Sequence, residues 1–150
     1  MIEGLFDNGA LPVLERMVQF TERRHHVLAN NIANLSNPYF KSADLDPGSF
    51  QGALREAIDD RRRHHGGGGA PGGTNGPLEL HDTDELRFTP DGIEAQPREL
   101  NEMILFHDQS NVDLERTMQR LAENTLAHNV SIELVRNQFA LLEMAIRERP

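Results

Sequence analysis

Seven histidines are the residues of this 150-residue chain that most invite a search for metal chemistry. A zinc site on a helix needs two ligands on one face, at positions i and i+4 or at a comparable convergent spacing. Here the histidines occur as two adjacent pairs, whose rings would diverge by about 100° on a helix, and as three widely separated residues. They are His25-His26, His64-His65, His81, His107 and His128. We therefore expect no metal site.

Other patterns that could carry chemistry are incomplete. The glycine-rich stretch 66–77 resembles a phosphate-binding loop, but no Lys-Ser or Lys-Thr follows it. Asp82 and Asp84 begin like a calcium loop, without the glycine and the distal glutamate that such a loop needs. No serine lies in a nucleophile-elbow context, and there is no cysteine. We expect no catalytic residue, no cofactor and no small-molecule substrate, so the protein is predicted not to be an enzyme.

The composition favours an elongated helical protein. Only 37% of residues are hydrophobic and there is no tryptophan, so few large side chains are available to fill a round core. The net charge is -9, with the acidity mostly in the second half, and this opposes binding to nucleic acid phosphates. The N-terminus has neither a basic nor a long apolar stretch, so we expect no cleavable signal peptide and no membrane span.

Two long helices are predicted by heptad rows, in which seam residues recur at alternating spacings of three and four. The first helix covers roughly 11–35, with Pro12 near its start, and Asn37-Pro38 follows its end. The second covers 113–147, with Asp113 as its N-cap. The rows include Leu14, Val18 and Leu28 in the first helix, and Leu121, Ile132, Val135, Phe139 and Leu142 in the second.

Each row also contains a threonine followed by a histidine: Thr21 and His25 in the first helix, Thr125 and His128 in the second. Polar residues in a heptad row restrict which partner and register are tolerated. Alternatively, these positions are exposed at the edge of a partly buried row.

The predicted fold is mainly α, with the two heptad helices forming an antiparallel coiled coil around a short, partly flexible central segment. Three regions follow: residues 1–44, residues 45–110 with a glycine-rich linker at 66–77, and residues 111–150. In the centre we expect a short helix over 45–60 and a solvated charge run at Arg61–Arg63. Minor β structure is expected at Leu78–Leu80 and Leu86–Phe88, before a turn at 90–92.

An asparagine-rich stretch stands out because asparagine is a poor helix former. It comprises Ala29, Asn30, Asn31, Ile32, Ala33 and Asn34. Amide groups beside small alanines suit close, directional packing between subunits. A fraying helix end with an asparagine cap is the alternative.

That stretch, followed by Asn37-Pro38 and Phe40-Lys41, resembles the N-terminal motif of the bacterial flagellar axial proteins, the rod and hook superfamily. Asn111, Val112 and Asp113, followed by Leu114-Glu115 and then by Met118, Leu121-Ala122 and Asn124, resemble the C-terminal motif of the same superfamily. The resemblance covers about half of the chain, at both ends. Within the superfamily the sequence looks most like FlgB-like proximal rod proteins, with FlgC-like rod proteins as the nearest alternative. It departs from the pattern at Asn37, where threonine is usual, and at Tyr39, where glycine is usual, so we expect the turn there to differ in detail.

The resemblance implies a structural subunit of the flagellar basal-body rod in the periplasmic space, exported through the flagellar type III apparatus without cleavage of a signal. It implies terminal helices that are disordered in the monomer and form coiled coils in the assembled rod, where they transmit torque. The implied partners are further copies of the chain, FlgC-like and FlgF/FlgG-like rod subunits, FliE and the flagellar export gate. A cytoplasmic coiled-coil adaptor or type III export chaperone, which would share the heptads and the acidity, is the alternative.

Overall fold

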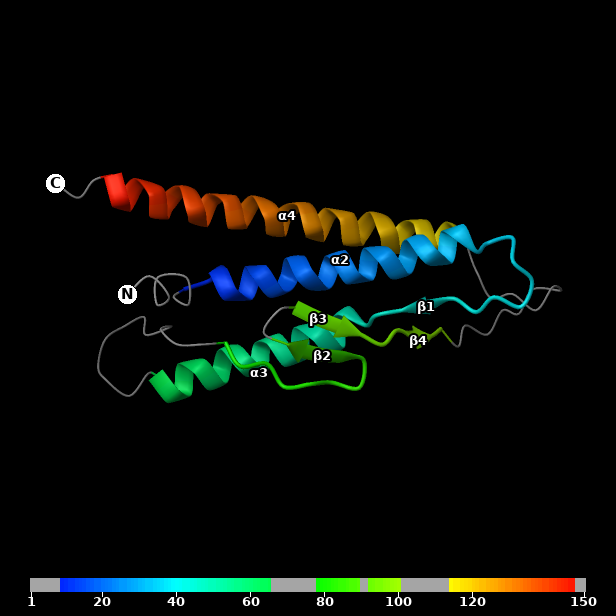
Figure 1. Cartoon of the computed structure of the whole chain (residues 1–150), viewed down its shortest axis with the longest axis horizontal. Coiled ribbons are helices and arrows are strands. Elements are labelled where there is room, and N and C mark those ends of the chain that lie inside the picture. The colour runs from blue at the N-terminus through cyan, green and yellow to red at the C-terminus, as the bar shows by residue number, and fades with distance from the viewer. Residues whose placement is uncertain (1–8, 66–77, 90–91, 101–113, 148–150) are drawn as a thin grey trace.

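The computed structural model describes residues 9–65, 78–89, 92–100 and 114–147. The chain is mainly helical, as predicted, with helices α2 (Leu11–Ala33), α3 (Pro47–His65) and α4 (Leu114–Arg147). Helix α2 lies in the middle of the molecule, with α4 alongside one of its faces and α3 with the strands alongside the other (Figure 1). The two terminal helices run antiparallel (Figure 1). No helix in the described ranges is both long and apolar enough to cross a membrane.

Four short strands complete the described part of the chain. β2 (Leu86–Thr89) and β3 (Gly92–Ala95) form an antiparallel hairpin, in which Phe88 pairs with Ile93. β1 (Ala43–Asp44) pairs with β4 (Arg98–Glu99), so that Ala43 lies opposite Glu99. The prediction of a strand at Leu86–Phe88 is confirmed. The prediction at Leu78–Leu80 is wrong, because those residues belong to no strand.

The hydrophobic core lies between α2, α3 and the β2–β3 hairpin. The ring of Phe20 from α2 stacks on that of Phe50 from α3, with 4.2 Å between the centroids and 2° between the planes. Leu45, Leu54, Leu86 and Ile93 are buried around this pair. The core therefore joins the first heptad helix to the central segment of the sequence.

Helix α3 is longer than the helix predicted over 45–60, and it includes the arginine cluster. The prediction that Arg61–Arg63 form a solvated run is wrong for Arg61, which is buried and donates to the carbonyl of Gly9 at 2.9 Å. Burial and the neighbouring charge of Arg62 lower the pKa of Arg61 from its usual value. Arg62 and Arg63 are exposed and pair with Asp59 and Asp60 on the same helix.

Several predictions fall outside the described residues. These are the glycine-rich linker at 66–77, residues 90–91 of the expected turn, and the C-terminal motif residues Asn111, Val112 and Asp113, the last of which was the expected N-cap.

Candidate interaction site: the α2–α4 seam and the outer face of α4

We use the term seam for the residues of α2 and α4 that face each other, and its centre is polar. The buried side chain of Asn124 donates from Nδ2 to the backbone carbonyl of Thr21 at 2.8 Å. The hydroxyl of the same threonine lies 2.8 Å from Nδ1 of His128. Thr21 is thus contacted twice by α4, from two positions one helical turn apart.

A regular polar row on α4 faces α2. Thr117, Asn124 and Ser131 are buried and stand seven residues apart, and Gln138, half-buried, continues the row. Ser131 has no exposed surface and donates to the carbonyl of Ala127 at 2.8 Å. Small and polar side chains at the most buried positions let the helices approach closely, but they bury little apolar area.

The heptad row predicted on α4 agrees with the observed seam at every second position and differs from it by one residue at the positions between. Leu121, His128, Val135 and Leu142 are half-buried, as expected of seam residues. Between them, the most buried positions are Thr117, Asn124 and Ser131, where the prediction had Met118, Thr125 and Ile132. Ile132 is half-buried, whereas Phe139 is 46% exposed and does not lie at the centre of the seam.

On α2, Leu14 and Leu28 are buried and Val18 is half-buried. Leu14 and Leu28 lie seven residues on either side of Thr21, on the helix face that contacts α4. The predicted row on α2 therefore coincides with the observed seam better than the predicted row on α4 does.

The outer face of α4, which we define by Leu126, Val130, Leu134, Leu141 and Met144, carries large hydrophobic side chains that are 43–67% exposed. Their spacing of mostly three or four residues places them along one side of the helix, away from the seam. A helix with apolar residues on the face turned away from its neighbour can bury them only against another molecule or segment.

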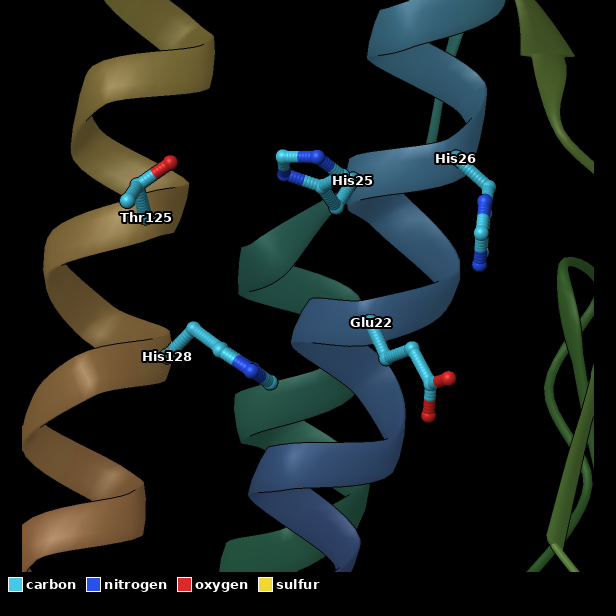
Figure 2. A pocket seen from close by; sticks show the side chains of 5 residues that line it. All are labelled: Glu22, His25, His26, Thr125 and His128. Atoms are coloured by element: carbon cyan, nitrogen blue, oxygen red, sulfur yellow. The ribbon is translucent and has the colours of Figure 1, made fainter.

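An open hollow of about 160 Å³ lies between α2 and α4, lined by Glu22, His25, His26, Thr125 and His128. Figure 2 shows His25 reaching from α2 toward α4 and His128 reaching from α4 toward α2, while Glu22 and His26 point to the other side of α2. Because these side chains diverge, they form no convergent ligand set. Within the described part of the chain, no group of three or more His, Cys, Asp or Glu residues is placed to hold a metal ion.

A second hollow, of about 430 Å³, lies where the start of α2 faces the second half of α4. Its lining is mainly apolar and comprises Leu11, Pro12, Val18, Val135 and Phe139, with Glu15 and Gln19 at its edge. Phe139 therefore borders a groove between the two helices rather than filling the seam.

The asparagine-rich stretch has one buried residue, Asn31, while most of its other residues lie closer to solvent. Asn31 is 1% exposed; its Nδ2 donates to the carbonyl of Ala43 at 2.7 Å, and its Oδ1 accepts from the amide of Ala43 at 3.2 Å. This pair of bonds fixes β1 against the end of α2. Asn34 is the C-cap residue of α2. The inferred subunit-facing role therefore does not extend to Asn31, whose amide is used within the chain.

The other residues of this stretch lie closer to solvent. Ala29, Asn30 and Ala33 are exposed, Ile32 is half-buried, and Pro38 is exposed in the turn that follows. The next residue, Tyr39, is 71% exposed and has a φ of 66°. This is the left-handed region that glycine adopts at little cost and tyrosine does not. Tyr39 therefore holds, at a cost in backbone strain, the positive φ that a glycine would permit at this position.

A buried ion pair connects the core, β1 and α4. Arg24 of α2 binds Asp44 through two hydrogen bonds of 2.8 and 2.7 Å, and both side chains are about nine-tenths buried. Asp44 also accepts from the amide of Leu45 at 2.8 Å. Nε of Arg120 on α4 approaches the same carboxylate at 3.9 Å. This network lies beside Asn124, one turn further along α4.

Sequence reasoning placed Asn124 in the C-terminal motif but did not predict its contact with Thr21, and it missed the Arg24–Asp44 pair. The recurrence of Thr117, Asn124, Ser131 and Gln138 at intervals of seven was available as a signal. It was overlooked because heptad rows are ordinarily sought among apolar residues. No local pattern connects Arg24 with Asp44, which are 20 residues apart.

No protein-family model matches the chain. A search of curated proteins finds no match either.

Proposed function

We propose that the chain is a structural subunit of the bacterial flagellar basal-body rod, most similar to the FlgB-like proximal rod proteins and next to the FlgC-like ones. In this proposal it is exported without cleavage of a signal and assembles in the periplasmic space. Its partners are further copies of itself, FlgC-like and FlgF/FlgG-like subunits, FliE and the export gate. It performs no chemistry.

The observation that carries the proposal is the apolar outer face of α4, which lies away from a seam whose most buried positions on that helix are polar. The side of α4 that faces α2 carries a polar row, whereas large hydrophobic residues line the outer face of α4. In a protein that acts alone, that distribution would be reversed. It suits a helix that is meant to be surrounded by further helices in an assembly.

The free energy gained by burying the outer face of α4 indicates how strongly the subunits would associate. Each large residue on the outer face keeps about half of its surface exposed, and burying that half contributes roughly 1 kcal/mol. A single contact made by a few such residues corresponds to weak, roughly millimolar association. Subunits would thus remain separate in solution and assemble only where several neighbours contact each helix at once.

The proposal includes the finer arrangement expected from the heptads, an antiparallel coiled coil of α2 and α4 in the assembled rod. Support comes from the antiparallel course of the two helices and from the half-buried positions Leu121, Val135 and Leu142. Further support comes from the resemblance of residues 29–34 and 111–113 to the two superfamily motifs.

The proposal is tested by deleting the gene and restoring it on a plasmid, with swimming and the protein content of purified basal bodies as readouts. The intact chain should be found in basal bodies, and its deletion should abolish swimming. Leu134→Glu on the outer face should prevent complementation while leaving the thermal unfolding of the monomer within a few degrees of the parent. Asn129→Glu adds the same charge at an exposed polar position of α4, and it should complement. Swimming of the deletion strain would refute the proposal.

The second candidate, a cytoplasmic coiled-coil adaptor or export chaperone, is favoured by the same outer face, which could hold an apolar helix of an export cargo. The two functions differ in where the protein is found. A chaperone would remain in the cytoplasmic fraction bound to its cargo, and basal bodies purified from the same cells would lack it.

A further inference from the structure

Thr21 of α2 is bound by two side chains of α4. α4 contacts this one residue at two points, the backbone carbonyl through Asn124 and the hydroxyl through His128. We call these three residues the clasp. Asn124 is 2% exposed and Thr21 is 5% exposed, so water cannot readily replace the hydrogen bond between them.

The hydrogen atoms of the clasp can be assigned from the donors available. The Thr21 hydroxyl has one proton to donate, and its oxygen lies 2.9 Å from the carbonyl oxygen of Met17 and 3.0 Å from that of Val18. With this proton directed to the helix backbone, the hydroxyl oxygen accepts, and Nδ1 of His128 is the donor. The clasp thus consists of an amide donor and an imidazole donor on α4, aimed at two acceptors of the same residue.

Only one position along α4 offers this pair of donors. Asn124 and His128 stand four residues apart. The equivalent positions seven residues earlier on α4 are Thr117 and Leu121, and those seven residues later are Ser131 and Val135. A slip of one heptad in either direction would place leucine or valine opposite the Thr21 hydroxyl. It would also bury the amide of Asn124 or expose it away from its acceptor. Leu121, Val135 and Leu142 are half-buried and stand at multiples of seven residues, so the apolar contacts of the seam distinguish these registers less than the clasp does.

We propose that the Thr21–Asn124–His128 clasp is the specificity-determining element of the α2–α4 pairing: it selects one register and contributes little to the strength of the pairing. Polar residues at the most buried heptad positions are known to act in this way, at a cost in stability. In an assembly that contains many similar helices, such an element would keep α2 matched to one position of α4.

The experiment uses the absence of cysteine from the chain. Val18→Cys with Val135→Cys reports the observed register, because both residues line the same groove. Val18→Cys with Leu142→Cys reports a slip of one heptad. A bismaleimide shorter than the roughly 10.5 Å length of one heptad can join the first pair in the observed register and the second only after slippage. Each cysteine pair is placed in the otherwise intact full-length chain and in the clasp variant Asn124→Leu with His128→Leu.

In the intact chain we expect the first pair to cross-link at least tenfold faster than the second. In the clasp variant the two rates should come within about threefold of each other, while the melting temperature of the chain is unchanged or higher. A control with Gln119→Leu and Asn129→Leu adds the same apolar groups at exposed positions of α4, and it should keep the tenfold preference.

The proposal is overturned if the clasp variant keeps the tenfold preference, since the register is then set by other contacts. It is also overturned if the variant loses both cross-links or melts markedly lower, since the clasp is then a requirement for pairing rather than for register. Neither result concerns flagellar assembly, which is tested separately by complementation.

Discussion

Helix α2 presents chemically different surfaces to its two neighbours. Toward α3 and the hairpin it contributes Phe20, stacked on Phe50, with Leu45, Leu54, Leu86 and Ile93 buried around them. Toward α4 it contributes Thr21, which meets the polar row of that helix. The first contact rests on the burial of large apolar side chains, whereas the second combines leucine and valine side chains with directional hydrogen bonds, which contribute less net free energy.

The difference indicates that the molecule contains a self-sufficient part and a dependent part. The core of α2, α3 and the hairpin closes on itself. Helix α4 is 34 residues long but buries few apolar side chains, and it retains an apolar outer face. The resemblance to flagellar axial proteins implies that both terminal helices are disordered in the monomer. The core packing of α2 argues that this expectation applies to α4 far more than to α2.

The largest effect is expected in the core. Phe20→Ala removes a buried ring together with its stacking contact on Phe50, and it should lower the free energy of unfolding by about 4 kcal/mol. Urea denaturation followed by far-ultraviolet circular dichroism measures the loss. Phe139→Ala, which removes the same ring from the edge of the seam, should cost less than about 1 kcal/mol. Equal losses would contradict the division of the molecule into two parts.

A slightly smaller effect is expected where the two parts meet. Asp44→Ala leaves Arg24 buried without its carboxylate partner, and it should cost about 3 kcal/mol because an uncompensated charge remains in the interior. The same change removes the carboxylate that Arg120 approaches, so the signal from α4 should become more sensitive to urea. Glu99→Ala serves as the control, since its ion pair with Lys41 is exposed and should contribute little.

The seam itself should be less sensitive. Leu121→Ala removes a half-buried side chain, and it should cost about 1 to 1.5 kcal/mol, well below the loss expected for Phe20→Ala. Hydrogen exchange of α4 amides should accelerate more than that of α2 amides. Leu134→Ala, on the outer face, should change the monomer's stability by no more than about 0.5 kcal/mol. A loss near that of Phe20→Ala would mean that the seam is as strongly packed as the core.

The smallest effect should be an increase in the stability of the chain. Tyr39→Gly removes the strain of a positive φ at an exposed residue and should stabilise the chain by about 1 kcal/mol, less the added entropy of the unfolded glycine. Thermal unfolding measures the shift. Tyr39→Ala keeps the strain and should leave the melting temperature nearly unchanged. Destabilisation by Tyr39→Gly would show that the exposed ring makes a contact that outweighs the backbone strain.

Much of the secondary structure could be predicted because it depends on local spacing. The heptad row with Leu14, Val18 and Leu28 predicted α2, and Pro12 and Asn34 lie at its ends as such residues commonly do. The row through Leu121, Val135 and Leu142 predicted α4. The alternation at Leu86–Phe88 predicted β2. Phe139 borders the groove between α2 and α4 but remains half exposed, because spacing alone does not determine which of two adjacent rows is the most buried.

The sequence by itself determined where the two terminal helices lie and that residues 29–34 are unusual in composition. Only the tertiary structure decided that Asn31 binds β1, that Arg24 finds Asp44, and that α4 turns Thr117, Asn124 and Ser131 toward α2. The physical reason is the distance along the chain between the residues that interact. Helix formation and capping depend on residues within about one turn of each other. The rotation of α4 depends on satisfying buried donors and acceptors that belong to residues about 100 positions apart in the chain.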